Sequence, residues 1–167
     1  MIKTVFFLIL LIGCSNYDNK SSVEKKDYLN RQLLLPNLFI HNKRYKQSYR
    51  TNTKYKIIAY INGNCYYCLP DLDKWEQLLN DFNCSSLFYI HTFDSVALKS
   101  ELERIQFNEP YCIDINQKFL IMNHLPNNKT FHSFVINESN EIQVLGDPVN
   151  DFSCRNEFKK ALLQEVR

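Results

Sequence analysis

The stretch from residue 55 to residue 70 constrains the fold of this chain more than any other. Residues 57–61 (Ile-Ile-Ala-Tyr-Ile) form a short apolar run typical of a strand buried on both faces. The next three residues, Asn62-Gly63-Asn64, are a strong turn signal. From Cys68 onward the apolar residues recur three or four apart, as on one face of a helix: Leu72, Trp75, Leu79 and Phe82. The pattern predicts a strand, a tight turn and a helix.

Two cysteines, Cys65 and Cys68, stand at the junction of this strand and helix with C-x-x-C spacing. A helix N-terminus stabilises a thiolate, so the position favours a disulfide redox site. Zinc is the rival use of C-x-x-C, but the chain has only one such pair. The remaining candidate ligands are scattered without ligand spacing, so no metal site is predicted: Cys84, Cys112, Cys154, His41, His91, His124 and His132.

Composition excludes several other classes of function. The 167 residues fit one domain with a leader and a tether, and 45% hydrophobic residues are enough for a core. A net charge of +2 without a Lys/Arg block gives no nucleic-acid surface. Only 3 glycines are present, which excludes a glycine-rich phosphate loop. No organic cofactor is predicted.

The first 14 residues carry an export pattern. Lys3 gives a positive start, and residues 5–12 form an apolar run too short to span a bilayer. Leu-Ile-Gly-Cys, ending at Cys14, resembles the lipobox of bacterial lipoproteins. The resemblance implies a signal peptide at 1–13, lipidation of Cys14, and a location in the bacterial cell envelope, facing the periplasm or the surface. An ordinary signal peptide with a chance cysteine is the alternative.

The polar residues 14–32 are expected to be a flexible tether, and residues 33–167 a single domain. Further strands are expected at 33–40 (an edge strand broken at Pro36), 87–91, 131–136 and 142–145, the last two joined by a tight turn. Helices are expected at about 95–107 and 151–165. The stretch 110–126 is mixed, with a short strand or extended piece around 111–114 and then one at 118–122.

This order of elements predicts an α/β fold with a mixed sheet between helices. Together with the C-x-x-C motif, it resembles the thioredoxin fold over about residues 33–167, most closely the extracytoplasmic redoxins tethered by a lipid. The resemblance implies that Cys65 is the exposed nucleophile and Cys68 the buried resolving thiol. It also implies a loop that faces the substrate, formed by Tyr66, Tyr67, Lys129 and Thr130.

The implied activity is thiol–disulfide exchange on exported thiol- or disulfide-containing proteins, in concert with a redox partner protein. The membrane is reached through the lipid, and nucleic acid is not a partner. The alternative is a non-catalytic binding or assembly lipoprotein that reuses the same fold.

The sequence departs from the family pattern at three positions. Asn64 stands where relatives often have Trp, and Ala59 aligns with the buried acid that assists the second cysteine in thioredoxin. Lys129 falls where relatives have a cis-proline, so a trans backbone is predicted there. Asn62 replaces the Thr of resembling peroxidases, which argues against a peroxidatic site. Six further residues are expected in buried or edge positions: Cys84, Cys112 (nearest the active face), Cys154, Trp75, His91 and His132.

Overall fold

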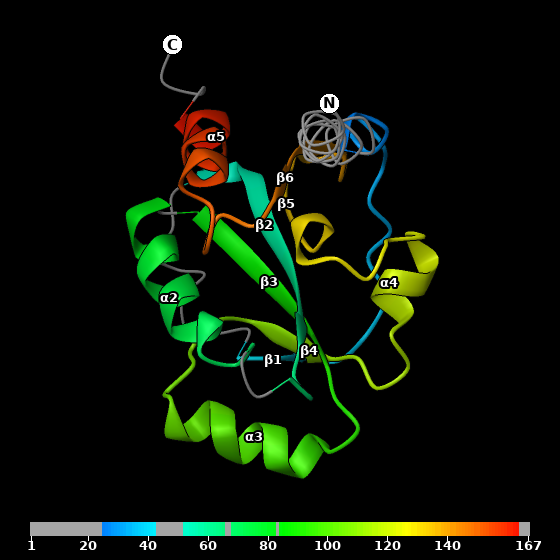
Figure 1. Cartoon of the computed structure of the whole chain (residues 1–167), viewed down its shortest axis with the longest axis vertical. Helices are drawn as coiled ribbons and strands as arrows, with labels where there is room; N and C mark the ends of the chain where they lie inside the picture. The colour runs from blue at the N-terminus through cyan, green and yellow to red at the C-terminus, as the bar shows by residue number, and fades with distance from the viewer. Residues whose placement is uncertain (1–24, 43–51, 66–67, 83, 164–167) are drawn as a thin grey trace, which may run out of the picture.

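A six-stranded mixed sheet forms the centre of the molecule. The computed structural model describes residues 25–42, 52–65, 68–82 and 84–163 (Figure 1). The strand order is β1-β4-β3-β2-β5-β6; β2, β3 and β4 are parallel, and the other neighbours are antiparallel. The strands are β1 Ile40–His41, β2 Asn52–Asn62, β3 Cys84–His91, β4 Tyr111–Ile113, β5 Ser133–Ile136 and β6 Ile142–Gly146. The helices are α2 Asp71–Phe82, α3 Ser95–Arg104, α4 Lys118–Met122, the 3-10 turn η1 Lys129–Phe131, and α5 Phe152–Leu163.

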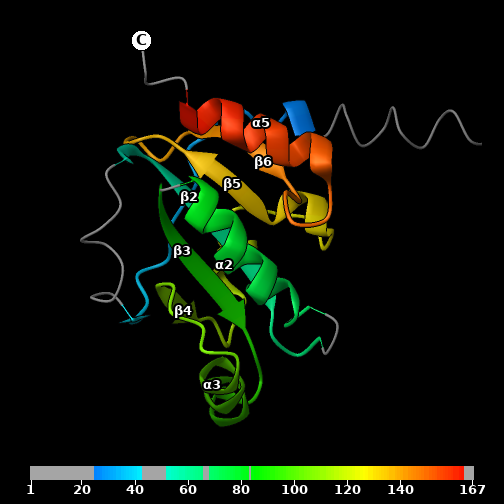
Figure 2. The same ribbon diagram turned by 90° about the vertical axis from the view of Figure 1, so that its left-hand side faces the viewer.

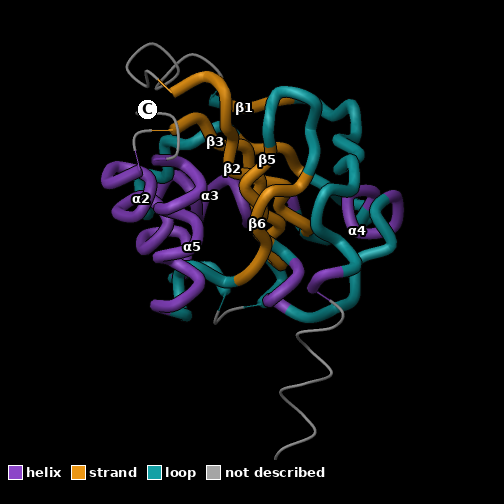
Figure 3. The backbone as a smooth tube through the Cα atoms, turned by 90° about the horizontal axis from the view of Figure 1, so that it is seen from above, coloured by secondary structure: helices purple, strands orange, loops and turns teal. Residues whose placement is uncertain are grey.

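Helices cover both faces of the sheet. Helices α2, α3 and α5 lie on one side and α4 on the other (Figure 3), and Figure 2 shows α2 and α5 over the same face. Alternate residues of β2 therefore enter two separate apolar clusters, because successive side chains of a strand point to opposite faces. Ile57, Ala59 and Ile61 pack toward α2 and α5, whereas Ile58 and Tyr60 pack toward α4.

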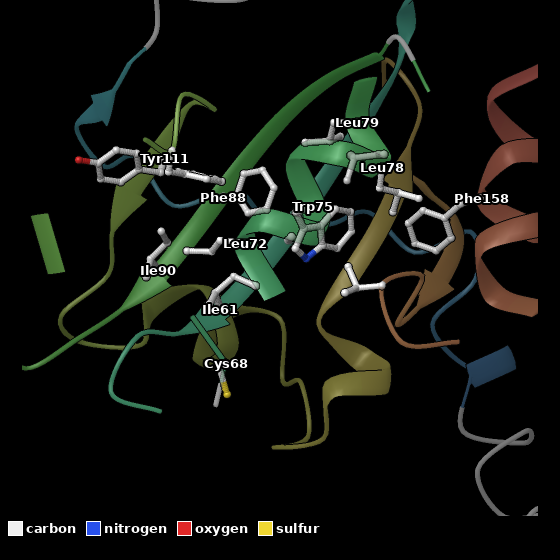
Figure 4. Packing of buried hydrophobic residues seen from close by; sticks show 14 of the residues in the cluster. Ile61, Cys68, Leu72, Trp75, Leu78, Leu79, Phe88, Ile90, Tyr111 and Phe158 are labelled. Carbon is white, nitrogen blue, oxygen red and sulfur yellow. The ribbon is translucent and has the colours of Figure 1, made fainter. Parts of the chain in front are cut away.

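Trp75 of α2 lies near the middle of the first cluster. Its side chain is 2% exposed and meets the ring of Phe88 edge-to-face, with 5.6 Å between centroids (Figure 4). Leu72 of α2 and Phe158 of α5 complete this layer, and both are fully buried. The predicted core role of Trp75 is confirmed. Cys68 lies at the edge of the same cluster, so α2 joins the core to the C-x-x-C motif.

The predicted mixed sheet between helices is confirmed, but two elements were predicted wrongly. The edge strand expected at 33–40 is only Ile40–His41, because the proline at 36 has no backbone N–H with which to continue a ladder. Residues 118–122, expected to be extended, form helix α4. The Asp114 carboxylate accepts hydrogen bonds from the N–H groups of Lys118 and Phe119 and so caps that helix.

The segment before β1 lies along the other edge of the sheet. The N–H of Asn30 donates to the carbonyl of Ile142 at 2.8 Å, and the N–H of Leu33 donates to the carbonyl of Asn140 at 2.8 Å. Gln32 forms an isolated bridge with Glu141. These contacts cover the exposed edge of β6, which would otherwise present unpaired backbone groups. The proposed leader, Cys14, and residues 15–24 of the tether lie outside the described residues.

The chain before β5 turns more tightly than expected. The strand predicted from residue 131 begins at Ser133, and residues 129–131 form η1 instead. Asn128 starts this turn, because its side-chain oxygen accepts the N–H of Thr130 at 3.0 Å. No cis peptide bond occurs in the described parts of the chain, so the trans backbone predicted at Lys129 is confirmed. None of the helices described is long and apolar enough to cross a bilayer.

Candidate redox site

The C-x-x-C pair is joined by a disulfide where β2 passes into α2. Cys65 and Cys68 are bonded, with 5.2 Å between their Cα atoms. The N–H of Cys68 donates to the carbonyl of Cys65 at 2.9 Å, and the N–H of Asp71 donates to the carbonyl of Cys68 at 3.2 Å. Cys68 is 7% exposed, whereas Cys65 is half-buried. The two sulfurs therefore differ in access, with Cys65 the more accessible.

Asn64 and Gly63 fix the turn that presents Cys65. The Asn64 side-chain oxygen accepts the N–H of Phe93 at 2.9 Å, which ties the turn to the loop after β3. The N–H of Gly63 donates to the carbonyl of His91 at 2.7 Å. A Cβ at Gly63 would lie 2.9 Å from that same carbonyl oxygen, so only glycine fits this close approach. Asn64, where relatives often have Trp, thus anchors the turn by hydrogen bonds.

A cavity of about 140 Å³ opens beside Cys68. Its volume is enough for several water molecules; most of its wall is apolar, and charged or polar side chains such as Asp71, Lys129 and His132 reach it from different elements. The lining residues come from β2, α2, the segment around η1, the first residue of β5 and the residue after β6: Tyr60, Ile61, Asn62, Cys68, Asp71, Trp75, Asn127, Lys129, His132, Ser133 and Asp147. Cys68 therefore shares this cavity with ionisable side chains.

Asp71 is the first residue of α2 and carries a stable negative charge at this cavity. Its carboxylate pairs with Lys74 at 3.0 Å and with Lys129 at 3.1 Å, and its side chain is only 13% exposed. Burial acts to raise the pKa of Asp71, but the hydrogen bonds and charges of the two lysines outweigh it and hold the pKa below its ordinary value. The carboxylate beside Cys68 is therefore ionised and neutralised by two cations.

His132 is held neutral with a fixed tautomer. Its Nε2 lies 3.0 Å from the carbonyl oxygen of Pro126, which can only accept, so Nε2 carries the hydrogen. Burial lowers the pKa of His132, and Lys129 lowers it further, against the Pro126 hydrogen bond and Asp147, which act to raise it. The ring of Tyr60 meets the imidazole edge-to-face at 5.0 Å.

His91 is also a hydrogen-bonded core residue. It is 3% exposed; its Nδ1 lies 2.9 Å from the carbonyl oxygen of Asp114, and its Nε2 lies 3.0 Å from the amide of Gln117. The prediction that His91 and His132 are hydrogen-bonded structural residues is confirmed. In the described part of the chain, no three His, Cys, Asp or Glu side chains are grouped to hold a metal ion.

The other described cysteines are small buried residues, as predicted. Cys84, Cys112 and Cys154 are each at most 2% exposed. Burial, with the charge of Asp114 in support, raises the pKa of Cys112 to about 11. Burial likewise raises the pKa of Cys154 to about 12. Cys112 packs among the core residues on the α4 side of the sheet and does not line the cavity beside Cys68.

Two of the four residues predicted for the substrate-facing loop lie in the described part of the chain. Lys129 reaches the cavity beside Cys68 and contacts Asp71. Thr130 is half-buried in η1 and does not line that cavity. Tyr66 and Tyr67 lie outside the described residues. The sequence reasoning did not find the Asp71–Lys129 pair or the place of His132 at the cavity, because both depend on contacts between residues far apart in the chain.

Comparisons with solved structures identify the fold. A thiol-disulfide isomerase from Corynebacterium glutamicum matches with a TM-score of 0.58 and 16% identity, covering 82% of this chain and 99% of the other. The thioredoxin domain of a thiol-disulfide oxidoreductase from Bacteroides vulgatus matches with a TM-score of 0.53 and 11% identity, covering 66% and 81%.

A secreted disulfide oxidoreductase from Mycobacterium tuberculosis matches with a TM-score of 0.50 and 11% identity, covering 66% of this chain and 82% of the other. No protein-family model matches the sequence, and no curated protein matches it. At these identities the likeness is one of fold: the chain has a thioredoxin-like fold, a mixed sheet flanked by helices in one domain.

Proposed function

We propose that this protein is a lipid-anchored, extracytoplasmic thiol–disulfide exchanger that acts on exported proteins through its Cys65-Tyr-Tyr-Cys68 motif. The observation that carries the proposal is the disulfide between a half-buried Cys65 and a shielded Cys68 at the N-terminal end of α2. A thioredoxin-like fold with an accessible and a shielded sulfur at this junction suits two-step exchange. Tyr66, Tyr67, Lys129 and Thr130 are proposed to face the client.

The exchange follows from the two different sulfurs. In the reduced protein, the Cys65 thiolate attacks one sulfur of a client disulfide, and the other client sulfur leaves as a thiolate and takes up a proton. The Cys68 thiol then loses its proton and attacks the sulfur of Cys65. This step re-forms the Cys65–Cys68 bond and releases the second client sulfur as a thiol. The client gains two electrons and two protons. A partner protein must then supply two electrons and two protons to reduce the Cys65–Cys68 disulfide again.

Two features of the site support these roles. The helix N-terminus after Cys68 places partial positive charge near the motif, which stabilises a thiolate. The cavity beside Cys68 is large enough for water and has polar side chains in its wall, and water there would offer a route for the proton that this thiol must lose. When the protein oxidises a client, the same steps run in the opposite order.

The envelope location is proposed from the leader. The charged start, the short apolar run and Leu-Ile-Gly-Cys14 favour export and lipidation. A secreted disulfide oxidoreductase among the structurally similar proteins is consistent with such a location. Disulfide exchange also suits an oxidising compartment.

Trapping of mixed disulfides tests the proposal. Cys68→Ser leaves Cys65 able to attack but removes the thiol that resolves the adduct. In cells making the full chain at native level, this variant should accumulate covalent adducts with exported proteins, seen as high-mass bands on a non-reducing gel that collapse on reduction. Cys65→Ser is the matched control and should trap little. If neither variant traps a client, exchange is refuted and the binding or assembly lipoprotein becomes the better account.

A further inference from the structure

The carboxylate of Asp71 opposes the effect of the helix N-terminus on the redox pair. A helix start favours negative charge nearby, but a carboxylate in the first turn repels a second anion. Asp71 lies three residues after Cys68, and its N–H donates a hydrogen bond to the carbonyl of Cys68. Both residues line the same cavity. With its side chain only 13% exposed, its charge is poorly screened by water.

Lys129 contacts this carboxylate from a different element. Its Nζ lies 3.1 Å from Asp71 Oδ2, although the two residues are 58 positions apart in the chain. Lys74 lies on α2 itself and binds the other oxygen, Oδ1, at 3.0 Å. Asn150 holds this arrangement from a third direction, because its side-chain oxygen accepts a hydrogen bond from Lys74 at 3.2 Å. Lys74 moves with α2, whereas the contact of Lys129 depends on η1.

We propose that Lys129 is a positioning residue of the redox site: by pairing with Asp71 it masks this carboxylate from Cys65 and Cys68, and so makes the reduced pair easier to deprotonate. The inference rests on the proposed function and deepens it. It gives a non-proline residue at the expected cis-proline position a role of its own, as an electrostatic link between the loop before β5 and the active helix.

The other charged and titratable groups at the cavity do not replace this effect. Asp147, after β6, contributes a second carboxylate, which accepts hydrogen bonds from Asn150 at 3.3 and 3.0 Å. His132 and Tyr60 are neutral near pH 7, because burial lowers the pKa of the first and raises the pKa of the second to about 12. Among the described residues that line the cavity, Lys129 is the one lysine.

The test measures how Cys65 titrates in the reduced full chain. Alkylation of Cys65 by iodoacetamide is followed by peptide mass spectrometry from pH 5 to pH 10, because only the thiolate reacts. Lys129→Met keeps the length of the side chain and should move the midpoint up by about half to one pH unit, the scale of a nearby charge pair in a partly screened site. Asp71→Asn should move the midpoint down.

Two further variants isolate the masking effect. Lys129→Arg keeps the charge and should restore the midpoint, and Lys118→Met, on the exposed surface of α4, should leave it unchanged. In the Asp71→Asn background, Lys129→Met should shift the midpoint by less than half as much. An equal shift in both backgrounds, or no shift on Lys129→Met alone, overturns the proposal. Circular dichroism and thermal melting check that each variant is folded.

This assay needs no client, so it separates the two proposals. Coupling between Lys129 and Asp71 without client trapping refutes exchange but keeps the electrostatic role. Trapping without coupling refutes only the role of Lys129.

Discussion

The substitution Ala59→Asp tests whether water reaches the buried position that aligns with the acid of thioredoxin. Ala59 lies in β2, 0% exposed, paired with Phe88 on one side and Ser133 on the other. Its side chain belongs to the apolar cluster to which α2 contributes Leu72 and Trp75. A carboxyl group placed there loses water and gains no cation that the structure shows, so its pKa must rise on folding.

The size of the penalty follows from the unfolded chain. An unfolded Asp has a pKa of about 3.9, so at pH 7 it is ionised and must take up a proton before it can be buried in its neutral form. Because pH 7 lies about three units above this pKa, the protonation costs about 4 kcal/mol. The penalty is limited to this value once the folded pKa exceeds 7. A group whose pKa is raised on folding destabilises the fold above its unfolded pKa, so the penalty should fall below about 1 kcal/mol near pH 4.

Urea unfolding of the Asp and Asn variants at pH 4, 5.5 and 7 measures this penalty. Asn has nearly the same shape and no charge, so the difference between the two variants removes the effects of size and of all other titrating groups. We expect the difference to grow from under about 1 to about 4 kcal/mol as the pH rises. Equal stability of the two variants at pH 7 would show that water from the cavity beside Cys68 reaches this position, and the dry packing inferred here would be wrong.

Three further predictions concern other cysteines. Cys14→Ser should abolish incorporation of radiolabelled fatty acid, and equal labelling of both forms would exclude lipidation. Gly146→Ala places a Cβ against the buried sulfur of Cys154 and should lower the free energy of unfolding by about 1 to 3 kcal/mol. Adding Cys154→Ala should recover most of this loss. Chemical denaturation measures both variants, and no recovery would mean that the clash lies elsewhere. Because burial raises the pKa of Cys112 to about 11 and of Cys154 to about 12, both thiols should resist alkylation at pH 8 in the native protein and react on unfolding; rapid native reaction would contradict their burial.

The core of the fold could be predicted because its signals are local. The apolar run 57–61, the turn at Gly63 and the helical spacing after Cys68 each act within a few residues, and they specify a strand, a turn and a helix. The hairpin after β5 was equally local, since Asn140 adopts a φ of 59°, which asparagine tolerates. The disulfide site could be predicted for the same reason.

Features that depend on distant residues were missed. Helix α4 is capped by Asp114, which lies four residues before its start and carries no periodic signal. β1 is reduced to two residues because it follows Pro36 and because its only described partner is the short β4; Pro36 could be read from the sequence, but the pairing with β4 could not. The pairing of Asp71 with Lys129 bridges 58 positions, so the sign of each charge could be read from the sequence but their contact could not.

The point where the N-terminal segment meets the domain bears on how an anchored protein would work. The side chain of Lys25 comes close to Gly146, which lies at the same end of the sheet as the redox site, because Gly146 pairs with Ser133 and Ser133 pairs with Ala59. Ten residues separate Cys14 from Lys25, so the chain between them spans at most about 40 Å. A lipid at Cys14 would therefore hold Lys25, and with it this end of the sheet, within about 40 Å of the membrane. Clients that pass close to the bilayer, such as newly exported chains, would meet Cys65 at a higher effective concentration than clients further away.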